Sequence, residues 1–344
     1  MNMDENGADV QFLLDTWEQV AGLEDLDAIL EVLEAAACRQ FQGPSRLHLE
    51  SNPAWIPILA AGRTEVVAYL ETVRPISSPT DQLFCRMAGW AVARSQLVRA
   101  SREQEEIVQS LRVARHILEE SLPESKLNWR DWEISGMLRP ALHLGGDLFS
   151  YSGRPERLRF LLADAVGHGL DSALLVSECR ALWRGLTYEQ DFQAEVSRLS
   201  QLLYENTGPE RYVAAILGRC GEDGWVEFVA CGQGPLFVLR QGEVELLGDP
   251  DLPLGLFPDQ QFELRKVQLQ PGQALFCTTD GMLEWQNADG EMFGSTGVVQ
   301  AVLNQPLGCS QHIIETVLQA VDAFHTPESA RDDACAIALI RKIR

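Results

Sequence analysis

Aspartates stand at the ends of several apolar segments of this chain. Asp147 follows two glycines after the segment PALHL, and Asp164 ends the segment RFLLA. Asp280 follows ALFCTT, and the pair Asp332 and Asp333 directly precedes ACAIALI. If these strand ends converge, like charges a few ångströms apart oppose one another by several kcal/mol per close pair, even at an effective dielectric constant of ~20. Such a cluster therefore needs a compensating cation.

The donor atoms of this set indicate which cation would bind. Carboxylate oxygens suit the hard divalent ions Mg²⁺ and Mn²⁺, and no coordinating set of histidines and cysteines stands beside them to suggest zinc. Glycine neighbours such as Gly146 and Gly281 let the backbone come close enough for a carbonyl to join the ligands. A single aspartate at a strand end is by default a cap or a turn residue. The four aspartates together favour metal ligation.

Composition narrows the class of protein. The 344 residues are 46% hydrophobic and 23% charged, which is typical of a globular protein with more than one domain. A net charge of −22 argues against nucleic acid or an anionic membrane as the main partner. The eight cysteines are scattered without a C-x-x-C pair, so we expect free thiols and a cytoplasmic location. No signal peptide and no run of 18 apolar residues is visible.

The pattern along the chain predicts an α+β protein. Residues 10–41 have helical spacing, residues 45–76 form short apolar runs broken by proline and glycine, and residues 81–122 predict one long helix that ends at Pro123. From residue 127 onward, short strand patterns are interrupted by helical stretches at about 171–186 and 189–206. This mixture defines the fold class.

The second half of the long helix carries a heptad repeat. Its seam, which has charged flanks, consists of Leu97, Ala100, Gln104, Ile107, Leu111, Ala114, Leu118 and Ser121. The seam is compatible with an amphipathic helix that packs on its own domain, or with a parallel coiled-coil dimer. We predict the second arrangement, a homodimer joined through residues 95–122.

Four segments that contain these aspartates resemble the signatures of a known family. They are HLGGDLFSY (143–151), LLADAVGHGLDSALL (161–175), CTTDGMLEWQNADGEMFG (277–294) and RDDACAIALI (331–340). They look like those of the PPM family of metal-dependent protein serine/threonine phosphatases, and specifically its bacterial SpoIIE-like branch, which acts in partner-switching stress signalling. RYVAAILG (211–218), CGQGPLFVL (231–239) and LPLGLF (252–257) also match in order and spacing, so the resemblance covers roughly residues 124–344.

The resemblance implies an αββα sandwich with two divalent cations, Mn²⁺ or Mg²⁺, at the ends of its sheets. Asp164 would bridge both cations, and the carbonyl of Ala165 would bind one of them. Asp280 and Asp332 would hold the other cation, while Asp147 would contribute directly or through water. Asp164 and Asp280 are the expected catalytic residues. Asp333 would lie behind these ligands, although the choice between Asp332 and Asp333 stays open.

Several positions depart from the family pattern. Ser150 stands where an aspartate is common, Gln233 where a histidine is common, and Ala334-Cys335 where a threonine is common. None of these changes removes an expected metal ligand. His168 could act as a general acid, but a role in stabilising the turn is the preferred interpretation.

The N-terminal part resembles a shortened GAF domain, so we expect a small GAF-like α/β domain over residues 1–94, a helical linker over 95–123 and the phosphatase domain over 124–344. Trp55, Cys85 and Trp90 could line a ligand pocket, although packing in the core is the preferred interpretation. No cofactor of this domain can be predicted.

Two functions from different classes follow. The first is a phosphatase regulated by its N-terminal domain, which would act on phosphoserine or phosphothreonine of a STAS-type anti-sigma-factor antagonist. The second is a catalytically silent pseudophosphatase that binds a signalling partner. The intact aspartates favour the enzyme.

Overall fold

The structure is a computed structural model of the 344-residue chain. It describes residues 3–51, 55–59, 66–73, 75–141, 144–186, 191–208, 210–248, 250–303, 305–325 and 332–343. The chain divides into two compact units, Met1–Gln109 and Ser110–Arg344.

The N-terminal unit combines helices with a small sheet. Its elements are α1 (Met3–Ala21), α2 (Leu26–Gln40), β1 (Arg46–His48), β2 (Ile56–Leu59), β3 (Val66–Glu71) and the first part of α3 (Pro79–Ser121). The three strands pair antiparallel in the order β1-β3-β2. The helical spacing at 10–41 is confirmed, but it forms two helices. Asp25 marks the start of the second one, since it caps α2 by accepting a hydrogen bond from the Ala28 amide.

Helix α3 packs closely on the sheet of this unit. A side chain at Gly89 would meet the carbonyl oxygen of Leu59 at 2.1 Å, so this crossing requires glycine. Phe84 and Leu33 are fully buried in the same core. Cys85 belongs to the partly buried residues packed against this core, as the core-packing interpretation predicted, but that interpretation is wrong for Trp90, which is 38% exposed. The resemblance of this unit to a GAF domain stays a prediction.

The second unit contains two antiparallel sheets. The six-stranded sheet has the order β11-β10-β13-β14-β5-β4, and the five-stranded sheet has the order β12-β9-β8-β7-β6. The strands are β4 (Lys126–Trp129), β5 (Trp132–Arg139), β6 (Asp147–Gly153), β7 (Leu158–Ala165), β8 (Val213–Cys220), β9 (Trp225–Cys231), β10 (Leu236–Arg240), β11 (Glu243–Leu247), β12 (Arg265–Gln268), β13 (Ala274–Thr278) and β14 (Ala334–Arg341).

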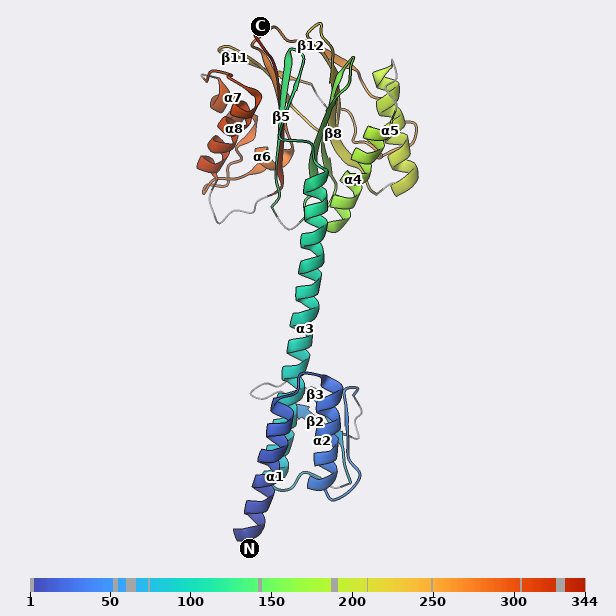
Figure 1. Cartoon of the computed structure of the whole chain (residues 1–344), viewed down its shortest axis with the longest axis vertical. Helices are drawn as coiled ribbons and strands as arrows, with labels where there is room; N and C mark the ends of the chain where they lie inside the picture. The colour runs from blue at the N-terminus through green and yellow to red at the C-terminus, as the bar shows by residue number, and fades with distance from the viewer. Residues whose placement is uncertain are drawn as a thin grey trace. The chain divides into compact units, whose positions relative to one another are not determined.

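Helices cover the outer faces of both sheets (Figure 1). They are α4 (Leu170–Gly185) and α5 (Phe192–Thr207) on the five-stranded sheet, and α6 (Asp280–Glu284), α7 (Gly294–Val302) and α8 (Ser310–Phe324) on the six-stranded sheet. The inner faces of the two sheets share one core. These four layers confirm the predicted αββα sandwich, and the predicted helices at 171–186 and 189–206 are confirmed as α4 and α5.

Strand β7 shows how the sequence specifies these layers. Phe160 and Leu162 point into the core between the sheets, whereas Leu161 and Ala163 point towards α4 and α5. A strand with both faces buried needs apolar residues at every position, not at alternate ones. The unbroken run RFLLA therefore leads directly to Asp164 near the C-terminal end of β7.

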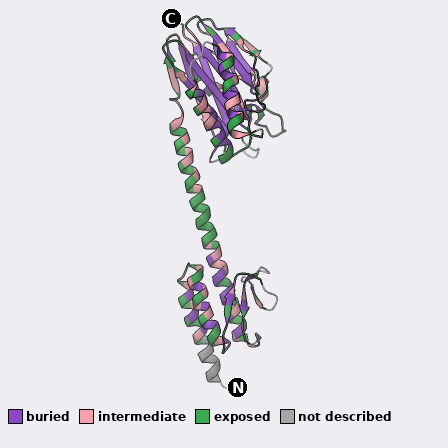
Figure 2. Ribbon diagram, turned by 90° about the vertical axis from the view of Figure 1, so that its right-hand side faces the viewer, coloured by how far each residue is buried: buried purple, intermediate pink, exposed green. Residues whose placement is uncertain are grey.

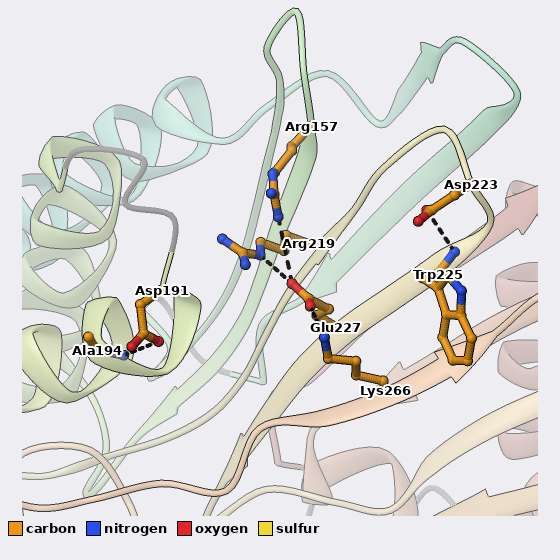
Figure 3. Close-up of polar contacts among 8 residues, drawn as sticks. All are labelled: Arg157, Asp191, Ala194, Arg219, Asp223, Trp225, Glu227 and Lys266. Carbon is orange, nitrogen blue, oxygen red and sulfur yellow. Dashed lines mark hydrogen bonds and ion pairs between the residues drawn. The ribbon is translucent and has the colours of Figure 1, made fainter.

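Charged side chains form ion pairs between neighbouring strands of the five-stranded sheet, away from Asp164 (Figure 3). Glu227 of β9 accepts a hydrogen bond from Arg219 of β8 at 2.6 Å and pairs with Lys266 of β12 at 2.5 Å. Arg157 lies 3.6 Å from the same carboxylate. Burial disfavours the charged form of Glu227, but the hydrogen bonds from Lys266 and Arg219 outweigh burial and lower its pKa.

The middle of α3 is exposed, and residues 101–107 present every side chain to solvent (Figure 2). Within the described part of the chain, no helix combines the length and the apolar character needed to cross a membrane.

Candidate metal centre

Strand pairing brings the predicted aspartates to one end of the sandwich, where several strands begin or end. Asp147 begins β6 and lies directly opposite Asp164 of β7 in the antiparallel register. In the other sheet, β13 ends at Thr278, and α6 begins at Asp280 two residues later. Asp332 comes just before β14, which pairs with β13. Each sheet therefore contributes two aspartates.

The electrostatics show that these carboxylates lie within reach of one another. Burial raises the pKa of Asp147 well above its usual value, and the charge of Asp164 raises it further. Burial raises the pKa of Asp164 to about 8, with added contributions from Asp280 and Asp332. The four aspartates predicted from the sequence thus form one cluster.

Asp333 differs from the other aspartates in what it contacts. Its carboxylate accepts hydrogen bonds from the backbone amides of Ala141 and Gly146, both at 2.8 Å. These bonds hold the loop that leads into Asp147. Because both Asp333 oxygens are engaged by amides, Asp332 is the better candidate for a direct ligand.

Glycines beside the aspartates are required by close packing. A side chain at Gly145 would meet the Asp333 carboxylate at 2.3 Å, and one at Gly281 would meet the Asp333 carbonyl at 1.8 Å. A side chain at Gly146 would lie 2.9 Å from the carbonyl oxygen of Ala165, so glycine lets the two backbone segments approach closely here. The predicted carbonyl ligand therefore lies at the edge that carries Asp147 and Asp164.

The donor set fits divalent cations that prefer oxygen. It supplies carboxylates and a carbonyl, and a cation would stabilise the ionised form of these carboxylates, which burial disfavours. Among the described residues, no three side chains of the His, Cys, Asp and Glu types already enclose a position for a metal ion. Asp164 instead lies close enough to Asp280 for that charge to raise its pKa. A bound cation would relieve this repulsion.

Two residues of the site were missed by sequence reasoning. Thr279 donates a hydrogen bond to Asp147 at 2.6 Å. Burial raises the pKa of Glu284, and the charges of Asp280 and Asp332 raise it further, so this exposed carboxylate lies near the aspartates. The acidic spacing in DGMLE, one helical turn from Asp280, was a usable signal for Glu284.

The remaining predicted positions have plainer roles. His168 is exposed in the turn between β7 and α4, where Gly167 and Gly169 adopt positive φ angles of 95° and 81°. The buried Gln233 donates a hydrogen bond to the Thr278 carbonyl at 3.2 Å. His143 and Arg331, the first residues of two motifs, lie outside the described residues.

Comparison with known proteins decides the family. The model of the SpoIIE family, described as stage II sporulation protein E, matches residues 154–342, which is more than half of the chain. The chain belongs to the SpoIIE family. The predicted relationship to this branch of phosphatases is therefore confirmed.

Two curated proteins are similar in sequence. Protein IcfG of Synechocystis sp. is 20% identical over 262 residues, which is 67% of this chain and 41% of that protein. Phosphoserine phosphatase RsbP of Bacillus subtilis is 27% identical over 183 residues, which is 51% of this chain and 45% of that protein. The chain spans less than half the length of each relative.

Solved structures share the fold of the second unit. The PP2C domain of SiaA from Pseudomonas aeruginosa has a TM-score of 0.58 at 21% identity, over 70% of this chain and 99% of that one. The PP2C phosphatase domain of SpoIIE from Bacillus subtilis, solved with a fragment of its regulatory domain, has a TM-score of 0.53 at 18% identity, over 61% and 62% of the two chains. The unit thus has the fold of a PP2C-type protein serine/threonine phosphatase domain.

Proposed function

We propose that this chain is a metal-dependent phosphatase that hydrolyses phosphoserine and phosphothreonine in proteins. The observation that carries the proposal is the convergence of Asp147 and Asp164 from one sheet with Asp280 and Asp332 from the other. When buried carboxylates with raised pKa values are ionised, they repel one another unless a cation binds between them. Asp164, Asp280 and Asp332 lie within the residues that match the SpoIIE family, which supports a use for this cluster in catalysis.

Each ligand has a proposed part. Asp164 would bridge two cations, the Ala165 carbonyl would bind one, and Asp280 and Asp332 would hold the other. Asp147 would complete the site directly or through water. Once bound, divalent cations of this kind supply an activated water and neutralise charge on phosphoryl oxygens. The phosphoryl group passes to water as the bond between phosphorus and the serine or threonine oxygen breaks, which gives inorganic phosphate and the free hydroxyl.

The substrate we propose is a phosphorylated STAS-type anti-sigma-factor antagonist, in a partner-switching pathway. The support is the resemblance to the SpoIIE-like branch and the similarity to RsbP, a phosphoserine phosphatase. We place the protein in the cytoplasm, which suits the five buried cysteines, all of them free thiols. A preference for a phosphorylated STAS-type antagonist would distinguish a signalling enzyme from a general phosphatase.

We also propose that residues 1–94 form a regulatory domain of the GAF type and that residues 95–123 link it to the phosphatase domain. Support comes from the end of α3, where Arg180 of α4 donates hydrogen bonds to the hydroxyl and the carbonyl of Ser121. Helix α4 follows directly on the turn after Asp164. A shift at the end of α3 would therefore be felt next to the metal ligands.

The experiment that tests the function measures phosphate release from a phosphoserine protein by the full chain, with Mn²⁺, with Mg²⁺ and with a chelator. We expect metal-dependent release that Asp280→Asn abolishes. Asp289→Asn, a change at an exposed aspartate in the following turn, is the matched control and should keep full activity. Tight binding of the phosphoprotein without release under any metal would identify a pseudophosphatase instead.

A further inference from the structure

The side chain of Thr279 lies between the two sheets of the phosphatase domain. Its hydroxyl is 2.6 Å from Oδ2 of Asp147, which begins β6 in the five-stranded sheet. The same oxygen accepts a hydrogen bond at 3.1 Å from the amide of Cys335, which belongs to β14 in the six-stranded sheet. Thr279 is fully buried, and Asp280 follows it in the chain.

The direction of the hydroxyl proton follows from the neighbouring bonds. The carbonyl of Cys335 lies 3.4 Å from the Thr279 hydroxyl and could in principle accept its proton. That carbonyl already accepts bonds from the Thr279 amide at 2.9 Å and from the Thr278 hydroxyl at 2.8 Å, which fill its two lone pairs. The Thr279 proton is therefore donated to Asp147, at the shorter distance.

We infer that Thr279 is a positioning residue of the metal centre, which fixes the Asp147 carboxylate against the opposite sheet. One Asp147 oxygen is held by the hydroxyl, so the other stays oriented towards Asp164 and an incoming cation. Because residue 279 also precedes Asp280, the same bond sets the spacing between carboxylates that come from different sheets. The inference rests on the proposed metal-dependent function.

The adjacent threonine provides a matched control. Thr278 is equally buried, but its hydroxyl donates to the backbone carbonyls of Cys335 and Thr279 and not to a carboxylate. Both Thr278→Val and Thr279→Val replace a buried hydroxyl by a methyl group of similar size. Only the second change releases Asp147.

The test measures how the melting temperature of the full chain depends on Mn²⁺ concentration, alongside phosphatase activity. Loss of a partner that orients a metal ligand typically weakens binding 10–100-fold. We expect Thr279→Val to raise the Mn²⁺ concentration for half-maximal stabilisation by about tenfold or more, by that principle. Thr278→Val should leave this concentration nearly unchanged, and Thr279→Ser, which keeps the hydroxyl, should restore it.

A Thr279→Val variant that folds and has the Mn²⁺ dependence of the wild type would overturn the inference. If this variant does not fold, because the Cys335 amide is left without an acceptor, Thr279→Cys decides, since a thiol is a weak donor of similar size. A weakened Mn²⁺ response supports the positioning role, and a wild-type response overturns it. Failure of the proposed function is distinct, because the wild type itself would then show no metal-dependent phosphate release.

Discussion

Asp147 and Asp164 lie directly opposite each other on adjacent antiparallel strands, as the first residue of β6 and the penultimate residue of β7. Like charges at such a pair of positions destabilise a sheet. Burial at the same place raises the pKa of both carboxyl groups. The pair is therefore a local cost to folding that a bound cation would convert into stabilisation.

Replacing Asp164 with asparagine should separate function from stability. Loss of a residue that merely orients a metal ligand costs 10–100-fold, so loss of the proposed bridging ligand should lower turnover by more than about a hundredfold. The metal-free variant should melt at the same temperature as the wild type near pH 6, where Asp164 holds a proton, and at a higher temperature near pH 8, where the wild type must bury an ionised carboxylate. Calorimetry with and without Mn²⁺, beside an assay of phosphate release, measures both effects.

Asp171 provides the control for this change. It is an exposed aspartate in the first turn of α4, seven residues further along the chain. Asp171→Asn should keep both the activity and the stabilisation by Mn²⁺. Near-normal turnover of Asp164→Asn at saturating Mn²⁺ would show that the proposed centre is wrong.

Removing metal should make the stability of the chain depend on pH with a definite sign. The pKa of Asp164 is raised to about 8, whereas its unfolded value is near 3.8, so between these values the folded protein holds a proton that the unfolded chain releases. In chelator, stability should therefore fall as pH rises from 5.5 to 8, by up to about 1.4 kcal/mol per pH unit for each such group.

Mn²⁺ should reverse this trend, because the cation competes with protons and binds the ionised carboxylates better at higher pH. The rise in melting temperature on adding Mn²⁺ should thus be larger at pH 8 than at pH 6. Asp164→Asn should flatten the slope in chelator. A slope in chelator that is identical in wild type and variant would assign the pH dependence to other groups.

The sequence indicated where the aspartates stand on the strands, but it did not predict which strands are neighbours. Runs such as RFLLA are apolar at every position, as in strands with both faces buried, and each run ends at an aspartate. Asp164 and Asp280 could therefore be placed at the ends of strands. The position of β14 between β13 and β5 could not be predicted, because it pairs the last strand with the first long one. Such pairing depends on contacts distant in sequence, which no local pattern encodes.

Our preference for Asp332 over Asp333 as the proposed ligand also depends on the structure. Both are aspartates at one strand end, and only the amide bonds of Asp333 to the loop before Asp147 distinguish them. Thr279 was missed for a related reason. A threonine in a strand is common for its β-branched shape, so nothing in CTTD showed that this hydroxyl reaches the other sheet.

Glu227 should contribute stability without contributing to catalysis. Its carboxylate bonds Arg219 and Lys266 at the end of the sheet remote from Asp164. Glu227→Gln removes the negative charge that accepts these bonds and should cost about 1–3 kcal/mol at neutral pH, as for a hydrogen bond to a charged group. Chemical denaturation measures the loss, and activity per folded molecule should stay at the wild-type level.

The pH dependence of this contribution has the opposite sign to that of Asp164. The pKa of Glu227 is lowered in the folded state, so its contribution is present above the unfolded pKa and disappears as pH falls through the folded value. The difference in stability between wild type and Glu227→Gln should be largest near pH 7 and should disappear in acid. Glu263→Gln, whose side chain is largely exposed beside Arg265, should change stability little at any pH.

The seam of α3 predicts an interface between two copies of the chain. Leu97 and Ile107 are 64% and 61% exposed, although both are apolar and lie on the predicted heptad positions. Val113 and Ile117 are also exposed, and they lie just outside the seam. Burying this stripe against a second α3 would remove apolar surface from water, and the heptad spacing suits a parallel coiled coil.

Replacing both Ile107 and Leu111 with lysine should therefore prevent the homodimer that we propose through residues 95–122. Like charges would face each other across the seam, so we expect monomers by sedimentation at micromolar concentration where the wild type is a dimer. Specific activity should change as well, because a coiled coil has a few discrete packings and the end of α3 is bonded to Arg180 beside the metal ligands.

The matched control places two lysines on the other side of the same helix. Glu105 and Gln109 are exposed and lie off the seam, so Glu105→Lys with Gln109→Lys should leave the protein dimeric. This pair also tests whether added positive charge alone alters activity in a chain with a net charge of −22. A monomeric wild type, or a monomeric seam variant with unchanged turnover, would leave α3 as a passive spacer, because neither result is compatible with a helix that transmits a signal through its packing.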